Sequence, residues 1–164
     1  MRETAQRRMF SKNIVESDDF IDLSKGAKLL YFLLGVAADD EGFILNCKAI
    51  MRVHEIDKSE LDELIEKGFV IPFDKSLCIR HWTMNNQLRF DRFNKSECKD
   101  RDKIRISPTG KVYYTVEEIE QQSDLITVTL DEFIEQRKQG KSNSTAQRDE
   151  KTAALRDAFN RQYC

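Results

Sequence analysis

Cations, aromatic rings and amides interleave along residues 82–95, which we call the strap. These side chains are the strongest candidates in the sequence for binding a ligand. The strap reads WTMNNQLRFDRFNK. Arginine and lysine neutralise phosphates, and asparagine and glutamine hydrogen-bond to phosphates or to base edges. This composition favours contact with a nucleic acid, unless Trp82, Phe90 and Phe93 fold the strap onto a hydrophobic core and leave its arginines solvated.

Charge is segregated along the chain, although the formal net charge is only -2. Residues 80–111 carry nine basic and four acidic side chains, whereas residues 117–135 carry seven acidic side chains and no basic one. A second basic segment opens the chain with Arg7, Arg8 and Lys12. This distribution is typical of a protein with one surface for a polyanion. The first twelve residues form either a solvated arm or an arm that touches a phosphate backbone.

Residue patterns of common enzymes are absent from the sequence. It contains no P-loop, no dinucleotide-binding glycine motif and no nucleophile elbow. His54 and His81 have no cysteine or carboxylate at a metal-binding spacing, so we expect no catalytic residues, no metal and no cofactor. The four cysteines fit no disulfide framework, and no run of residues is apolar enough for a secretory signal or a membrane span. We therefore expect a cytoplasmic protein.

A long apolar helix is the first element that must position these side chains. Ser24 is a suitable N-cap for it, and Asp39 to Gly42 end it. The helix is apolar on most sides, which is typical of a central core helix. Its main apolar face consists of Ala27, Leu30, Tyr31, Leu34 and Ala38. This face is widened by Leu29, Phe32 and Leu33. Residues 43–45 read as a short strand that pairs with a later hairpin.

Two short helices joined by a tight turn follow. Asn46 is the expected N-cap of the first, which should bury Ile50 and Val53 on one face. Asp57 and Glu60 open the second helix as an acidic variant of a capping box. The apolar stripe of this helix and its terminal glycine are Leu61, Leu64, Ile65 and Gly68.

A β-hairpin completes this module. Residues 69–73 and 77–79 are rich in strand formers and flank the polar turn of residues 74–76. The order of helices and hairpin is that of a winged helix-turn-helix, an α+β fold with a three-helix core and a small antiparallel sheet whose usual ligand is DNA. We expect this domain, with the basic arm and the strap, to occupy residues 1–106.

Residues 107–164 are expected to form a C-terminal extension. Residues 103–106 and 111–116 read as two strands of a hairpin at its start. Residues 126–130 then alternate like an edge strand and lead into a helix. A last helix over residues 147–163 could dock on the body, pair with a second copy of the chain or stay free.

Several segments also resemble a known family: RRMFSK near the start, ADDEGF after the long helix, and the run from IRHW to DRF. Residues 5–116 resemble the N-terminal domain of phage replisome organizer proteins, the DnaD-like replication initiators of Gram-positive bacteria and their phages. The resemblance implies a winged helix that binds origin DNA or helps to assemble the helicase-loading complex. The partners to expect are double-stranded DNA, a helicase or loader, and further copies of the chain. The basic positions in the matching segments are Arg7, Arg8, Lys12, Lys48, Arg52, Arg80, Arg89, Arg92 and Lys95.

The second helix of the motif departs from a usual DNA-reading helix. Residues 54–74 carry seven acidic and two basic side chains, and placing them against phosphates would cost electrostatic energy. We therefore expect Lys48, Arg52, Arg80 and the strap to make most contacts with DNA. Two alternatives stay open. One is a protein-binding adaptor, or a phage inhibitor of a host protein, whose acidic helix holds a basic partner; the other is a dimeric transcriptional repressor that binds an inverted repeat.

Overall fold

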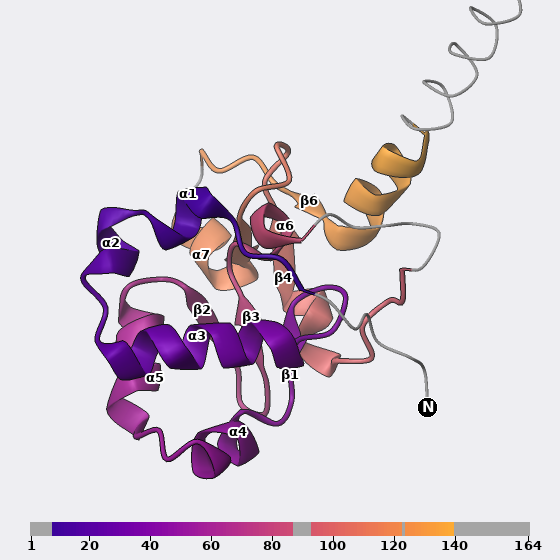
Figure 1. Cartoon of the computed structure of the whole chain (residues 1–164). Helices are drawn as coiled ribbons and strands as arrows, with labels where there is room; N and C mark the ends of the chain where they lie inside the picture. The colour runs from indigo at the N-terminus through magenta and orange to yellow at the C-terminus, as the bar shows by residue number, and fades with distance from the viewer. Residues whose placement is uncertain (1–7, 87–92, 123, 140–164) are drawn as a thin grey trace, which may run out of the picture. The chain divides into compact units, whose positions relative to one another are not determined.

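The chain is described by a computed structural model over residues 8–86, 93–122 and 124–139. These residues belong to two compact units, of which the second begins at Leu130. The first unit combines short helices with two small antiparallel sheets, so the expected mixed α+β class is confirmed (Figure 1). In the second unit, residues 130–139 form a helix. Every helix of the described residues is too short or too polar to span a lipid bilayer.

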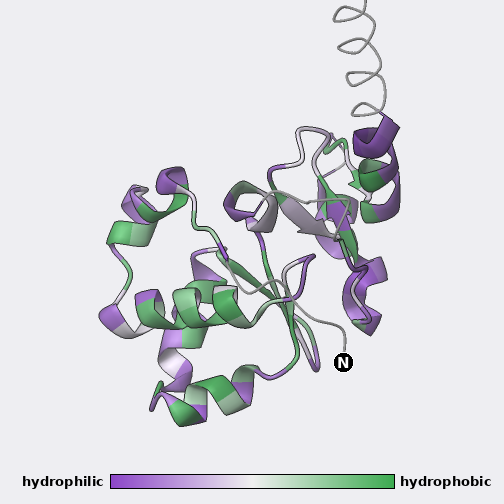
Figure 2. Cartoon of the chain, turned by 45° about the vertical axis from the view of Figure 1, so that its right-hand side comes forward, coloured by the Kyte–Doolittle hydropathy of each residue, from purple (hydrophilic) through white to green (hydrophobic). Residues whose placement is uncertain are grey.

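Helix α3 (Lys25–Ala37) lies at the centre of the core, as predicted. The Ser24 hydroxyl accepts a hydrogen bond from the backbone N–H of Ala27 at 3.1 Å, which confirms the expected N-cap. Figure 2 shows apolar residues along this helix and through the strands of the first sheet. The prediction that Leu29 widens the buried face is wrong, since Leu29 is 48% exposed. The core covers the face of α3 that carries Leu30 and Leu34, and Leu29 lies with the exposed Val36 on the other side of the helix.

Two single-turn helices that were not expected from the sequence precede α3. They are α1 (Lys12–Val15) and α2 (Asp18–Ile21). Ser17 caps α2, because its hydroxyl accepts a hydrogen bond from the backbone N–H of Phe20 at 3.3 Å. The Phe20 ring packs edge-on against the Tyr31 ring of α3, with centroids 5.2 Å apart. This segment therefore covers part of α3.

The two short helices and the hairpin are present in the predicted order. The elements are β1 (Phe43–Ile44), α4 (Cys47–Val53), α5 (Lys58–Glu66), β2 (Val70–Pro72) and β3 (Leu77–Ile79). The strands form one antiparallel sheet in the order β1-β3-β2, and both α4 and α5 contact α3 (Figure 1). Gly68 follows α5 with a φ of +74°, a left-handed conformation that glycine adopts at little cost.

Some local details of α4 and α5 differ from the prediction. Asn46 and Asp57 occupy the two N-cap positions, but neither side chain accepts a capping hydrogen bond. Asn46 has a φ of -111° and a ψ of 26°, which is not the extended conformation of a capping residue. The predicted burial of Val53 is wrong, because α4 lies at the surface and Val53 is 74% exposed.

A second small sheet follows the strap. Helix α6 (Trp82–Asn85) opens the strap itself, and the elements after the strap are the 3₁₀ helix η1 (Lys99–Lys103), β4 (Ile104–Ile106), β5 (Tyr113–Thr115), α7 (Val116–Gln121) and β6 (Val128–Thr129). The strand order β5-β4-β6, with both pairs antiparallel, confirms the predicted hairpin and the strand near Val128. Helix α7 was not expected from the sequence, although Thr115 and Glu118 form a capping box at its start.

The boundary between the two units differs from the one that was expected between residues 106 and 107. That position falls within the β4–β5 hairpin, and the first unit extends to Thr129. The helix expected over residues 147–163 lies outside the described residues.

Candidate functional site

The nine basic residues that were candidates for DNA contact fall into three groups. Arg7, Arg89 and Arg92 lie outside the described residues. Two others, Arg8 and Arg80, are largely buried and ion-paired. The third group is exposed: Lys12, Lys48, Arg52 and Lys95.

Arg8 holds the N-terminal segment against the loop after α3. Its Nη2 donates a hydrogen bond to the Ala38 carbonyl at 2.7 Å, and its Nη1 lies 3.3 Å from a carboxylate oxygen of Asp40. The guanidinium carbon lies 5.2 Å from the ring centroid of Trp82, and only 7% of the Arg8 side chain is exposed. The solvated-arm interpretation therefore does not hold at Arg8, and we leave this residue out of the proposed DNA interface.

Arg80 joins the first sheet to α7. Its two terminal nitrogens lie 2.7 and 3.1 Å from the two carboxylate oxygens of Glu118, a bidentate pair. Burial of Glu118 opposes its ionisation, but hydrogen bonds from Arg80 and from the Thr115 backbone outweigh this effect and lower the pKa of Glu118. The charge of Arg80 is thus balanced within the chain, and we also leave Arg80 out of the proposed interface.

The described start of the strap folds onto the core. Trp82 is fully buried, and its indole N–H donates to the Asp40 carbonyl at 2.8 Å. The amide oxygens of Asn85 and Asn86 accept hydrogen bonds from the backbone N–H groups of Ser11 and Met9, at 2.9 and 3.1 Å. The alternative in which aromatic residues fold the strap onto the core is therefore confirmed for Trp82, and these two amides hold the N-terminal segment. Phe90 lies outside the described residues.

The carboxylates of the acidic loop (Asp39–Glu41) bind side-chain and backbone groups of segments that are distant in the sequence. Glu41 and Arg101 form a buried bidentate pair with both N–O distances at 2.7 Å, and their side chains are 1% and 6% exposed. Glu41 also accepts a hydrogen bond from the Ser96 backbone at 2.8 Å. The described residues contain no cluster of side chains suited to a metal ion. These carboxylates therefore join α3 to the chain around η1.

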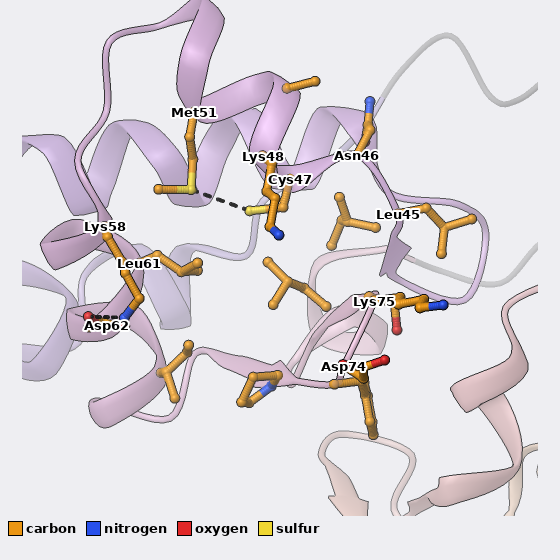
Figure 3. A pocket seen from close by; sticks show the side chains of 17 residues that line it. Leu45, Asn46, Cys47, Lys48, Met51, Lys58, Leu61, Asp62, Asp74 and Lys75 are labelled. Atoms are coloured by element: carbon orange, nitrogen blue, oxygen red, sulfur yellow. Dashed lines mark hydrogen bonds and ion pairs between the residues drawn. The ribbon is translucent and has the colours of Figure 1, made fainter.

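A groove of about 600 Å³ opens between α4, α5 and the β2–β3 turn (Figure 3). This volume lies within the range of roughly 300–1,000 Å³ that is typical of ligand pockets. Leu61 and Ile65 of α5 line the groove and are only half-buried, whereas Leu64 of the same helix is fully buried. The predicted stripe of α5 therefore divides between the core and this groove. The remaining apolar lining residues are Ile44, Leu45, Cys47, Ala49, Met51, Pro72, Phe73 and Leu77.

Cys47 behaves as part of the apolar lining. Its sulfur lies 3.6 Å from the sulfur of Met51, and burial raises the pKa of its thiol. The thiol is therefore neutral at physiological pH, as suits an apolar wall.

Charged side chains stand at the rim of the groove: Lys48, Lys58, Asp62, Asp74 and Lys75. Lys58 lies 2.6 Å from a carboxylate oxygen of Asp62, so this pair is self-compensated. Among the described residues no carboxylate lies within ion-pair distance of Lys48 or Lys75. Lys75 was not among the expected DNA contacts, because it directly follows the acidic stretch of residues 54–74 and belongs to neither basic segment.

Lys103 places a further ammonium near the ring of Phe73, which lines the groove. Asp100 and, more weakly, Glu117 and Asp74 raise the pKa of Lys103. The ammonium of Lys103 lies 5.8 Å from the centroid of the Phe73 ring. The rim of the groove itself holds three lysines and two aspartates, which gives it a net charge of +1.

Two features of the described surface are consequently open to a ligand: the exposed cations of α4 and the β2–β3 turn, and the apolar groove between them. Searches against protein-family models, curated proteins and solved structures returned no match to this chain.

Proposed function

We propose that this protein is a winged-helix DNA-binding protein of the replication-initiator type. The observation that carries the proposal is the element order α3, β1, α4, α5, β2 and β3 with the sheet order β1-β3-β2. A three-helix core followed by a hairpin on the same small sheet is the arrangement of a winged helix-turn-helix. The resemblance of residues 5–116 to phage replisome organizer proteins supports the same function.

The charges of the module favour an interface that does not centre on α5. Asp62 and Glu66 are exposed on this helix. Glu63 accepts a hydrogen bond from the Ser24 backbone at 2.9 Å, and its contacts with Ser24 lower its pKa, so it stays ionised. We propose that Lys48 and Arg52 of α4 and Lys75 of the β2–β3 turn face the phosphates, since each neutralised phosphate releases counterions.

A salt titration of duplex binding tests this proposal. The full chain is titrated with fragments of its own gene neighbourhood and with random duplex at several salt concentrations. We expect selective binding whose affinity falls steeply with salt. The charge reversals R52E and K75E should each weaken binding and reduce the salt slope by about one or two.

The exposed Lys111 provides a charge-matched control, because it lies in the β4–β5 turn of the second sheet, whereas the proposed interface is on α4 and the β2–β3 turn. The variant K111E should bind DNA almost as the wild type does. Absence of duplex binding at low salt would overturn the proposal and favour the protein-binding alternative. Equal weakening by K111E and R52E would show that only net charge matters.

A further inference from the structure

The floor of the groove between α4, α5 and the β2–β3 turn leaves apolar side chains accessible. Leu45 is 67% exposed, and Met51, Leu61, Ile65 and Phe73 are half-buried. Figure 3 shows Leu45, Met51 and Leu61 around one hollow, from the segment before α4, from α4 and from α5. Accessible apolar side chains gathered within a polar rim mark sites of interaction.

The backbone around the groove favours a helical ligand over an extended one. An extended peptide binds by adding a strand to a sheet edge, where it needs free backbone N–H groups. The edge strand β2 ends in Pro72, which lines the groove and has no N–H to donate. The edge strand β1 has only two residues. An amphipathic helix needs only an apolar trough, and it presents anchors at positions i, i+3 or i+4, and i+7.

The rim selects the charge of that helix. Lys58 and Asp62 compensate each other, which leaves Lys48, Lys75 and Asp74 among the charged residues of the rim. Lys48 from α4 and Lys75 from the β2–β3 turn then stand against Asp74 alone, so the mouth of the groove has a net charge of +1 (Figure 3). Complementary charge favours a ligand with carboxylates beside its apolar anchors. A nucleic acid would satisfy the two lysines but would leave the apolar floor uncovered.

We infer that this groove binds an acidic amphipathic helix of a partner protein. The apolar face of the helix packs on Leu61, Ile65 and Phe73, and its carboxylates face Lys48 and Lys75. This inference does not rest on the proposed DNA binding. Because the two lysines also belong to the proposed DNA interface, the helix and duplex DNA compete for the protein.

Selection from a phage-displayed library of helical 18-residue peptides, with the full chain as the immobilised target, tests the inference. We expect enriched peptides to carry apolar residues at helical spacing together with aspartate or glutamate. A labelled peptide from the enriched set is then titrated with the full chain, and binding is measured by fluorescence anisotropy. Failure to enrich peptides of this pattern would overturn the inference.

Two surface substitutions provide a matched pair. Leu45 lines the groove and Val53 does not, and both are highly exposed, so L45E and V53E should both fold. L45E should weaken peptide binding about tenfold or more, whereas V53E should change it less than about twofold. Circular dichroism checks that both variants are folded. Equal binding by L45E and the wild type, or equal weakening by L45E and V53E, would place the peptide elsewhere.

Charge exchange separates this site from the DNA interface. K48E and K75E should each weaken binding of the acidic peptide. A peptide with lysine in place of its glutamates should bind K48E more tightly than the acidic peptide does. Arg52 lies outside the groove lining, so R52E should weaken DNA binding and leave peptide binding unchanged. If L45E instead abolishes self-association of the chain, seen by sedimentation, while no peptide binds, the ligand is a second copy and the inference of a partner protein fails.

Discussion

Around the acidic loop, arginines are buried against carboxylates, whereas at the groove lysines stand in solvent beside apolar side chains. Arg101 is 6% exposed and binds Glu41 with both ends of its guanidinium. Lys48 is exposed, and no carboxylate of the described residues pairs with it. Both regions belong to the first unit and use the same kinds of residues.

The difference shows how burial changes what a charge does. A buried ion pair is held by the cost of leaving either partner alone in a medium of low dielectric constant. An exposed cation contributes little to stability, so its charge remains available for a ligand. We therefore expect substitutions around the acidic loop to act on folding, and substitutions at the groove to act on binding.

The largest expected effect on stability comes from the buried pair. R101A leaves the Glu41 carboxylate buried without its partner and should lower the free energy of unfolding by about 3–5 kcal/mol. Urea denaturation of the full chain measures this loss. The double variant E41Q/R101M removes both charges and should recover a large part of it. A loss for R101A of less than about 1 kcal/mol would contradict this account of the loop, because an exposed pair is worth about that much.

Arg8 should show a smaller effect of the same kind. R8A removes the hydrogen bond to Ala38, the ion pair with Asp40 and the contact with Trp82. Because a hydrogen bond from a charged group contributes about 1.5–3 kcal/mol, and the Asp40 contact is the longer of the two at 3.3 Å, we expect a loss of about 2–3 kcal/mol in urea denaturation. Duplex affinity of the folded variant should stay close to that of the wild type. A variant of full stability with weakened DNA binding would return Arg8 to the DNA interface.

The pH dependence of stability tests the contribution of Glu118. Its pKa is lowered in the folded protein, so the Arg80–Glu118 pair stabilises the fold above the ordinary pKa of glutamate and loses this effect as pH falls through the lowered value. The side chains are 18% and 37% exposed, so screening limits the contribution to about 1 kcal/mol. Stability curves between pH 7 and pH 3 should fall less steeply for E118Q than for the wild type. Parallel curves would show that this pair is not coupled to folding.

The smallest effects on stability are expected at the rim of the groove. K48E and K75E should change the free energy of unfolding by less than about 0.5 kcal/mol, because both side chains are exposed and neither has a hydrogen bond or ion pair among the described residues. The same variants should weaken binding of DNA and of the acidic peptide. If either variant lost as much stability as R8A, the contrast between the two regions would fail.

Local patterns in the sequence determined most of the elements of the first unit. Ser24 caps α3, Gly68 ends α5 in the left-handed conformation, and a polar turn separates β2 from β3, all as expected. These features depend on residues within a few positions of one another, so a single sequence contains them. The capping box of Thr115 and Glu118 is such a signal, and it could have revealed α7.

The tertiary structure alone decided which charged side chains remain unpaired within the described residues and available to a ligand. Arg8, Arg80 and Lys48 look alike in the sequence, but the first two meet Asp40 and Glu118, which lie more than thirty positions away. The same holds for α5, where the apolar stripe was visible but its division between core and groove was not. Whether a side chain is covered depends on neighbours brought together by folding, and no local pattern records those neighbours.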